Sequence, residues 1–252
     1  LDLSEYDRKN LDETRVQRIR EELGFSQEDH IVVFVGRIAK EKAIEIPIEA
    51  ISKNTDPHLH LVIVGGGTDM EYYQDLAKKY NVEDRVHFTG KIPKENIAYY
   101  YAAFDCFVSA SLSETQGMTY IEALSSGLVV LARHDEVLEG LIKENENGYF
   151  FNKDIYEAIE KFDSLSKDEL NNMKEACMAS VDCYDADTFG ASSIRIYEEA
   201  LEDYKYSYVI EKTTLKDNCV ELTLRDFNDD NEKLTISMDM YANMGLRKNS
   251  RF

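Results

Sequence analysis

The chain has 252 residues, with 49 acidic and 29 basic side chains and a formal net charge of −20. This length fits one sizeable domain, or one domain with an appendage. The negative field repels polyphosphate backbones, which argues against nucleic-acid binding, and without a run of about 18 apolar residues the sequence predicts no membrane span.

An amphipathic helix is predicted at 8–23, and Gly24 ends it. Six apolar runs then alternate with helical patterns. The runs predict buried strands at 31–36, 60–67, 85–90, 105–111, 128–132 and 147–151. The segments between them predict helices at 41–52, 69–80, 94–103, 118–127 and 136–144. This alternation predicts an α/β fold with a doubly wound, parallel, six-stranded, Rossmann-like sheet that binds ligands at the carboxyl ends of its strands.

The remainder of the chain changes character. Helical patterns follow at 153–162, 167–180 and 187–204, so we expect a first domain over 1–205. Alternating apolar residues then predict a small antiparallel β appendage within 206–252, whose last residues, RKNSRF, are expected to be loose. Four widely spaced cysteines without a CxxC pair favour free thiols and a reducing cytoplasm. The missing initiator Met suggests a piece of a longer protein.

Three predicted strands end in loops suited to a ligand. Gly36, Arg37 and Lys42 follow the first, and the two cations either converge on a diphosphate or form a solvated basic pair. Gly66 is the centre of a glycine triplet that taken alone is more typical of a turn than of a nucleotide motif, but that also allows close packing against a ligand, so we count Gly66 among the donor-binding candidates. Backbone groups near Lys91 suit either the edge of a nucleobase or a plain turn.

The loop after the fourth strand carries the strongest signal. Glu114 and Glu122 stand eight residues apart, and Gly117 between them opens a helix whose free N–H groups can accept a phosphate. Eight residues span roughly 12 Å when helical. That separation suits a sugar at one end of a ligand, a ribose at the other and a diphosphate between them. Glu122 would accept hydrogen bonds from ribose hydroxyls.

These segments together resemble one family. The pair of glutamates matches the E-x7-E motif of the group-one retaining glycosyltransferases of the GT-B fold. The strings FVGRIAKEK, LVIVGGG, RVHFTGKIP, FVSASLSETQGMTYIEALSSG and NGYFF follow the order of that family's C-terminal, donor-binding domain. The resemblance covers about residues 30–152, and the opening LDLSEY is similar to the start of the same domain.

The resemblance implies a role for each matching residue. Arg37 and Lys42 would clamp the donor diphosphate, and Glu114 would lie beside the donor sugar. Glu122 would hold the ribose. The backbone at Gly117, Met118 and Thr119 would face the phosphates, and that of Lys91 and Ile92 the base. This sequence departs from the family at Ala43, where glycine is usual, and we expect only local backbone adjustment there.

The same resemblance implies what surrounds the site. The donor would be a nucleotide diphosphate sugar, UDP-linked by preference, with no cofactor or metal. An acceptor domain would precede this one, and the acceptor would be a cell-envelope lipid or glycan, with diacylglycerol glucosyltransferases as possible relatives. The full-length enzyme would be cytoplasmic, with peripheral association at the inner face of the membrane. The chain alone would transfer nothing.

Other interpretations stay open. A phosphorylase-like or sugar-phosphate enzyme can share this fold, as can a non-catalytic partner subunit, although the four charged residues argue against the latter. Asp185-Ala186-Asp187 spells the DxD of metal-dependent transferases, but Asp187 is better explained as a helix N-cap. The five histidines lack the spacing of zinc ligands.

Overall fold

The computed structural model describes residues 2–111, 117–184, 186–205, 208–216, 219–226 and 231–237. The chain divides into two compact units, residues 1–186 and residues 187–252. The first unit is an α/β domain, and the second consists of a helix and a small sheet.

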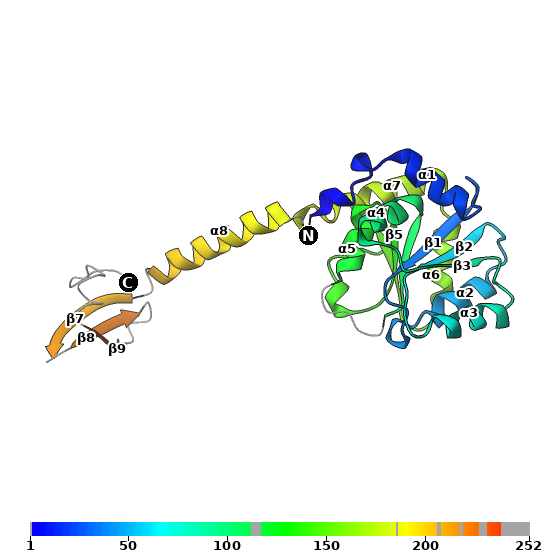
Figure 1. Cartoon of the computed structure of the whole chain (residues 1–252). Coiled ribbons are helices and arrows are strands. Elements are labelled where there is room, and N and C mark those ends of the chain that lie inside the picture. The colour runs from blue at the N-terminus through cyan, green and yellow to red at the C-terminus, as the bar shows by residue number, and fades with distance from the viewer. Residues whose placement is uncertain are drawn as a thin grey trace. The chain divides into compact units, whose positions relative to one another are not determined.

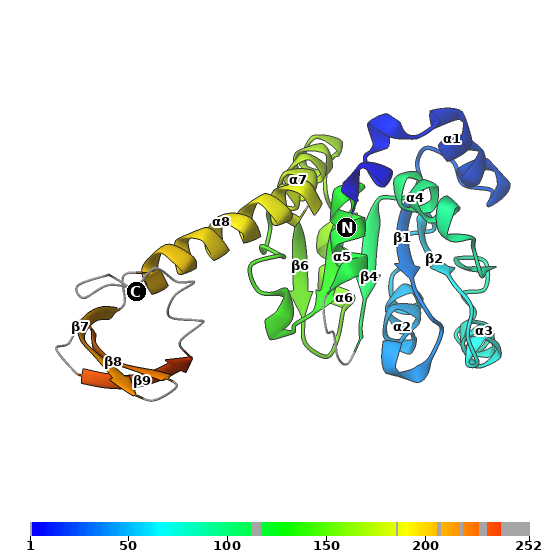
Figure 2. The ribbon, with the colours of Figure 1, turned by 60° about the vertical axis from the view of Figure 1, so that its left-hand side comes forward.

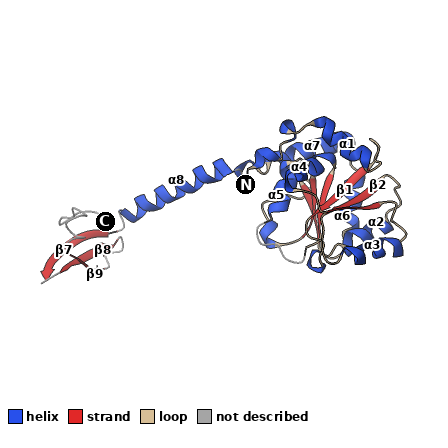
Figure 3. Cartoon of the chain, viewed as in Figure 1, coloured by secondary structure: helices blue, strands red, loops and turns tan. Residues whose placement is uncertain are grey.

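A parallel six-stranded sheet forms the centre of the first unit (Figures 1 and 3). Its strands are β1 (His30–Val35), β2 (Leu59–Val64), β3 (Val86–Gly90), β4 (Cys106–Ser109), β5 (Val129–Arg133) and β6 (Gly148–Phe151). Their order in space is β3-β2-β1-β4-β5-β6. The order reverses between β1 and β4, and ligands bind beside such a switch point in open α/β sheets. The predicted doubly wound fold is confirmed.

Helices cover both faces of this sheet (Figures 1 and 2). The α-helices are α1 (Glu13–Glu22), α2 (Glu45–Lys53), α3 (Met70–Lys79), α4 (Lys94–Ala103), α5 (Met118–Ser125), α6 (Tyr156–Asp163) and α7 (Lys167–Ala179). Contacts join α1 to α4, α4 to α5 and α5 to α7, whereas α2 contacts α3 and α6. These two contact groups form the two outer layers of the domain.

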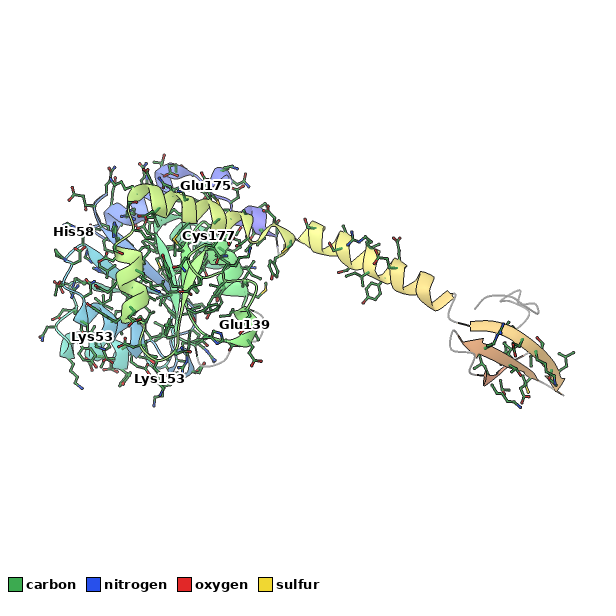
Figure 4. All side chains as sticks on the ribbon, turned by 180° about the vertical axis from the view of Figure 1, so that it is seen from behind. Lys53, His58, Glu139, Lys153, Glu175 and Cys177 are labelled. Carbon is green, nitrogen blue, oxygen red and sulfur yellow. The ribbon has the colours of Figure 1, made fainter. Side chains whose placement is uncertain are left out.

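The core follows from the sequence of the strands. Ile31, Val32 and Val33 are fully buried, as are most side chains of β2, β4 and β5. Strands covered on both faces require such continuous apolar runs. Phe107 on β4 packs against the rings of Tyr101 and Tyr120, and it thereby joins the central strand to α4 and α5. The described cysteines are free thiols, and Cys177 is buried on α7 (Figure 4).

Two helix predictions need correction. The segment 136–144 forms only a 3-10 turn, η4 (Glu136–Leu138), because Gly140 has a φ of 86°, a left-handed conformation that ends a helix. The predicted helix at 8–23 is divided into η2 (Arg8–Asn10) and α1. Asp12 causes the division, since its side chain caps α1 by accepting a hydrogen bond from the Thr14 N–H.

The second unit contains α8 (Ala186–Lys205) and an antiparallel sheet of β7 (Tyr208–Lys216), β8 (Cys219–Asp226) and β9 (Asn231–Ser237). The sheet confirms the predicted β appendage, and the RKNSRF terminus lies outside the described residues. The observed division places α8 with this sheet, whereas the sequence placed it in the first domain. Exposed Ile194 and Tyr197 show that its apolar spacing does not indicate burial. Because α8 begins at Ala186, Asp187 lies within its first turn and is not the N-cap.

A capping box begins α7, the helix that supports α5. The Ser166 hydroxyl accepts a hydrogen bond from the Glu169 N–H, and the Glu169 carboxylate accepts from the Ser166 N–H at 2.9 Å. Replacing Ser166 with alanine should lower the free energy of unfolding by about 1 kcal/mol, because it removes this cap. Urea unfolding measures the change. Ser164→Ala, two residues earlier and also exposed, should cost less than about 0.5 kcal/mol; equal losses would contradict the role of the cap.

Candidate functional site

A pocket lies at the carboxyl ends of β1, β2 and β3. Its volume is about 490 Å³. The residues that line it are Val35, Gly36, Arg37, Val64, Gly65, Gly66, Gly67, Lys91, Ile92 and Ile97. Five of them were predicted as site residues from the sequence: Gly36, Arg37, Gly66, Lys91 and Ile92. Residues from three separate loops therefore meet at one edge of the sheet, as the fold requires.

The charge of this pocket is opposite to that of the chain. Among the described residues, its lining includes the two cations Arg37 and Lys91 but no Asp or Glu. The protein as a whole carries a formal charge of −20. A concave site with only positive side chains raises the local concentration of anions, so the pocket suits an anionic ligand that also has an apolar or planar part to meet Ile92 and Ile97.

Backbone hydrogen bonds fix the loops around the pocket. The Gly36 N–H donates to the Val64 carbonyl at 3.0 Å, the Ile38 N–H to the Gly66 carbonyl at 3.0 Å, and the Gly65 N–H to the Gly90 carbonyl at 3.0 Å. These bonds continue the sheet beyond the ends of its strands. The loops approach so closely that a Cβ placed on Gly65 would lie 1.9 Å from the Gly36 carbonyl oxygen. A Cβ on Gly67 would likewise lie 1.9 Å from the Ile38 carbonyl oxygen, so the packing of the loops requires glycine at positions 65 and 67.

Lys42 and Arg37, the two residues predicted to bind the diphosphate, have different surroundings. Lys42 is half-buried at the end of the 3-10 helix η3 (Lys40–Lys42), and its Nζ lies 3.4 Å from the Ser111 hydroxyl, just beyond β4. Arg37 is three-quarters exposed and forms an ion pair with Glu41 at 2.5 Å. Such an exposed pair contributes little to stability, so a polyanion can compete for Arg37 at small cost. Sequence reasoning did not identify Ser111 or Glu41.

The residue after η3 keeps an unusual conformation. Ala43 has φ 48° and ψ 44°, which is the left-handed region that favours glycine. An L-residue there costs roughly 1–2 kcal/mol. The backbone therefore holds a left-handed geometry with alanine in place, and the local adjustment relative to the family stays a prediction.

Helix α5 begins at the predicted glycine. Gly117 adopts a left-handed conformation with φ 62°, and α5 starts at the next residue. Met118 is exposed and Thr119 half-buried on its first turn, so their N–H groups lie at the helix end that carries partial positive charge. Glu114 lies outside the described residues, so its predicted position beside the sugar stays a prediction.

Glu122 projects from α5 toward two tyrosines that the sequence had not connected to it. Its carboxylate accepts a hydrogen bond from the Tyr101 hydroxyl at 3.2 Å and another from the Tyr6 hydroxyl. Burial raises the pKa of Glu122, while these two hydrogen bonds and the charge of Lys94 lower it. Neither Glu122 nor Lys42 lines the pocket described above. The structure thus gathers five predicted residues in one pocket and leaves Lys42 and Glu122 on the neighbouring elements.

Neither a metal site nor a membrane span is found in the described part of the chain. There, no group of three or more His, Cys, Asp or Glu side chains is arranged to hold a metal ion. None of the described helices combines the length and apolar character needed to cross a bilayer.

Comparison with known proteins identifies the family. The sequence pattern of the family described as "Glycosyl transferases group 1" matches residues 15–179, well over half of the chain. The chain belongs to this family. An alpha-monoglucosyldiacylglycerol synthase from Acholeplasma laidlawii is 30% identical over 155 residues, which are 61% of this chain and 39% of that protein. The chain thus spans less than half the length of this relative.

Solved structures agree on the fold. The C-terminal domain of a glycosyl transferase group 1 protein from Francisella tularensis, LpcC, superposes with a TM-score of 0.62 at 23% identity, covering 72% of this chain and 96% of that one. Anabaena HepE in complex with UDP superposes with a TM-score of 0.67 at 19% identity, covering 80% of this chain and 56% of that one. The chain is a glycosyltransferase domain with the architecture of the C-terminal half of the GT-B fold.

Proposed function

We propose that this chain binds the nucleotide-sugar donor of a retaining glycosyltransferase, and that the donor is UDP-linked. The observation that carries the proposal is the pocket at the ends of β1 to β3, which has cations and no acid among its described lining residues. Arg37 and Lys42 would hold the diphosphate together with the amino end of α5. The backbone at Lys91 and Ile92 would meet the base, Glu122 the ribose and Glu114 the sugar.

In this proposal the protein lowers the activation barrier of sugar transfer by stabilising charge on the leaving group and by positioning the donor. The bond between the anomeric carbon and the diphosphate oxygen breaks, and the acceptor oxygen forms its bond to that carbon on the same face. The departing diphosphate takes up the acceptor proton. Arg37 and Lys42 stabilise the negative charge that develops on the leaving group. The proposed scheme needs no nucleophilic side chain and no metal ion.

The proposed acceptor is inferred from similarity to known proteins. Similarity to an alpha-monoglucosyldiacylglycerol synthase supports a cell-envelope lipid or glycan as the acceptor. An acceptor domain elsewhere in the full-length protein would bind it, with that protein in the cytoplasm at the inner face of the membrane. We therefore expect the chain alone to bind donor weakly and to transfer nothing.

A thermal-shift screen tests donor binding. UDP-linked sugars should raise the melting temperature in proportion to the logarithm of their concentration, since only the folded chain binds them. ADP- and GDP-linked sugars should do so less. No shift with any nucleotide sugar would contradict the proposal, and stabilisation by sugar 1-phosphates alone would favour a phosphorylase-like enzyme. Donor turnover by the full-length protein would exclude a non-catalytic partner.

The preference for ribose should depend on pH. Because burial raises the pKa of Glu122, this carboxylate should take up its proton at a higher pH than an ordinary glutamate, whose pKa is about 4.3. The affinity ratio of UDP to 2′-deoxy-UDP, measured by competition binding, should therefore be high at pH 7.5 and fall as pH is lowered toward this raised value. The ratio cancels the titration of the diphosphate itself. Glu122→Gln should show a low ratio at every pH; a similar decline in that variant would contradict the assignment.

A further inference from the structure

Two tyrosines from distant parts of the sequence hold Glu122. Tyr101, on α4, is completely buried, and its hydroxyl donates to Glu122 Oε2 at 3.2 Å. Tyr6, which follows the 3-10 helix η1 (Leu3–Glu5), is also buried and donates to the same carboxylate. The two rings pack edge to face with their centroids 6.0 Å apart. The carboxylate thus has a donor from each of two different elements.

The Tyr6 side of this arrangement is fixed to the helix that carries Glu122. The Ser125 hydroxyl lies 3.4 Å from the Leu3 carbonyl oxygen, and the Ser126 hydroxyl lies 3.3 Å from that of Tyr6. Both serines are buried at the end of α5. Leu3 is buried as well. The N-terminal segment is therefore anchored to α5 at the first residue of η1 and at the residue after it, and Tyr6 has little freedom to move away from Glu122.

The protonation states of the two phenols and of the Glu122 carboxylate determine which group donates each hydrogen bond. Burial, reinforced by the negative charge of Glu122, raises the pKa of both phenols, so each keeps its proton and acts as a donor. A phenol has one proton to donate, whereas a carboxylate offers about four acceptor positions. Two tyrosine donors leave about two positions, which is the number that the 2′- and 3′-hydroxyls of a ribose require.

We propose that Tyr6 and Tyr101 are positioning residues that orient the Glu122 carboxylate toward a ribose diol, and that they thereby set the selection of ribonucleotide over 2′-deoxyribonucleotide sugars. This inference rests on the proposed function, because it assumes a nucleoside diphosphate in the site. It goes further, since it assigns ribose selection to two side chains that would not touch the ligand. The Glu122 carboxylate can distinguish ribose from 2′-deoxyribose only if it is held in the orientation that meets both hydroxyls. Removing the hydrogen-bond donors that hold it should therefore lower this selectivity.

The test compares UDP with 2′-deoxy-UDP in single hydroxyl deletions. The unsubstituted chain should prefer UDP on the order of tenfold, the effect of a hydrogen bond to a charged group. In Tyr101→Phe and in Tyr6→Phe this preference should fall to about twofold, while the affinity for 2′-deoxy-UDP stays within about twofold of the original. Tyr100→Phe is the matched control, because this neighbour on α4 packs on Phe104 and should leave the preference unchanged.

A pH titration of the same ratio separates positioning from general packing. Removing one hydroxyl removes a hydrogen bond that lowers the pKa of Glu122. The carboxyl should then protonate at higher pH, so the remaining preference should be lost at higher pH than in the unsubstituted chain. A side chain with only a packing role would not produce this displacement.

Each outcome has one meaning. If the unsubstituted chain binds neither nucleotide, the proposed function fails. If it binds both equally, or if the phenylalanine variants keep the full preference while melting normally, the proposed function stands and the positioning role is overturned. If a variant loses affinity for both nucleotides in equal proportion, the tyrosine has only a structural role and the inference is likewise overturned.

Discussion

Replacing Lys42 with alanine should weaken UDP binding by on the order of ten- to a hundredfold. The half-buried Nζ lies 3.4 Å from the hydroxyl of Ser111, two residues beyond the end of β4. A charge-assisted hydrogen bond to phosphate contributes about 1.5–3 kcal/mol at such a site, more than at the open surface. Loss of that bond accounts for the expected change.

Arg37→Ala should also weaken UDP binding severely. The Arg37 guanidinium pairs with Glu41 and is three-quarters exposed. Binding must therefore exchange one ionic partner for another, and Arg37 gains a diphosphate whose oxygens match its paired donors. We expect a loss of UDP affinity close to that of Lys42→Ala. It should be somewhat smaller, because in the unsubstituted chain part of the interaction with the diphosphate offsets the cost of releasing Glu41.

Calorimetric titration of each variant with UDP measures both effects. Lys40→Ala is the matched control, because Lys40 belongs to the same 3-10 turn and has an exposed side chain. It removes the same charge and should change the affinity by less than about threefold, the share expected from long-range attraction alone. If all three variants bind UDP as tightly as the unsubstituted chain, the assignment of the diphosphate clamp is wrong.

Gly65→Ala should lower the free energy of unfolding by more than about 2 kcal/mol. A Cβ at this position would lie 1.9 Å from the Gly36 carbonyl oxygen, a backbone atom that cannot rotate away. The φ of 146° adds strain for any L-residue. Overpacking of this kind typically costs about 1–3 kcal/mol, and the backbone strain adds to it. The loops after β1 and β2 would have to separate, which would deform the pocket.

The neighbouring glycine supplies the control. A Cβ on Gly66 would meet the Lys91 Cβ at 3.5 Å, an ordinary van der Waals contact. Gly66→Ala should therefore unfold at nearly the same urea concentration as the unsubstituted chain, although it adds a methyl group to the pocket. Equal destabilisation by the two substitutions would show that the loops do not pack as described.

The sheet was predictable because its strands are buried on both faces. Continuous apolar runs such as 31–36 leave little alternative to a parallel, helix-covered strand. The segment 136–144 was mispredicted because its helical spacing of apolar residues also suits a loop that packs on the core. Leu138, Leu141 and Ile142 are buried without forming a helix. The left-handed conformation of Gly140 makes the segment a loop and not a helix, and the spacing of apolar residues alone does not predict that conformation.

The site was predictable in part. Resemblance to a family identified the residues at the ends of the strands, and the fold brings five of them into one pocket. Glu122 was assigned from its spacing to Glu114, but its two tyrosine partners were not. Tyr6 and Tyr101 belong to separate segments of the sequence, and only tertiary packing brings their hydroxyls to one carboxylate. The ion pair between Arg37 and Glu41 likewise depends on side-chain conformation, which periodicity does not specify.

We expect a nucleoside diphosphate to bind at the carboxyl ends of β1 to β4, beside the amino end of α5. Titration of UDP into the isotope-labelled chain, followed through its backbone amide NMR signals, tests this most directly. The largest shifts should occur at the amides of Gly36, Gly66, Lys91, Ile92 and Gly117. Shifts confined to the opposite edge of the sheet, or to the second unit, would contradict it.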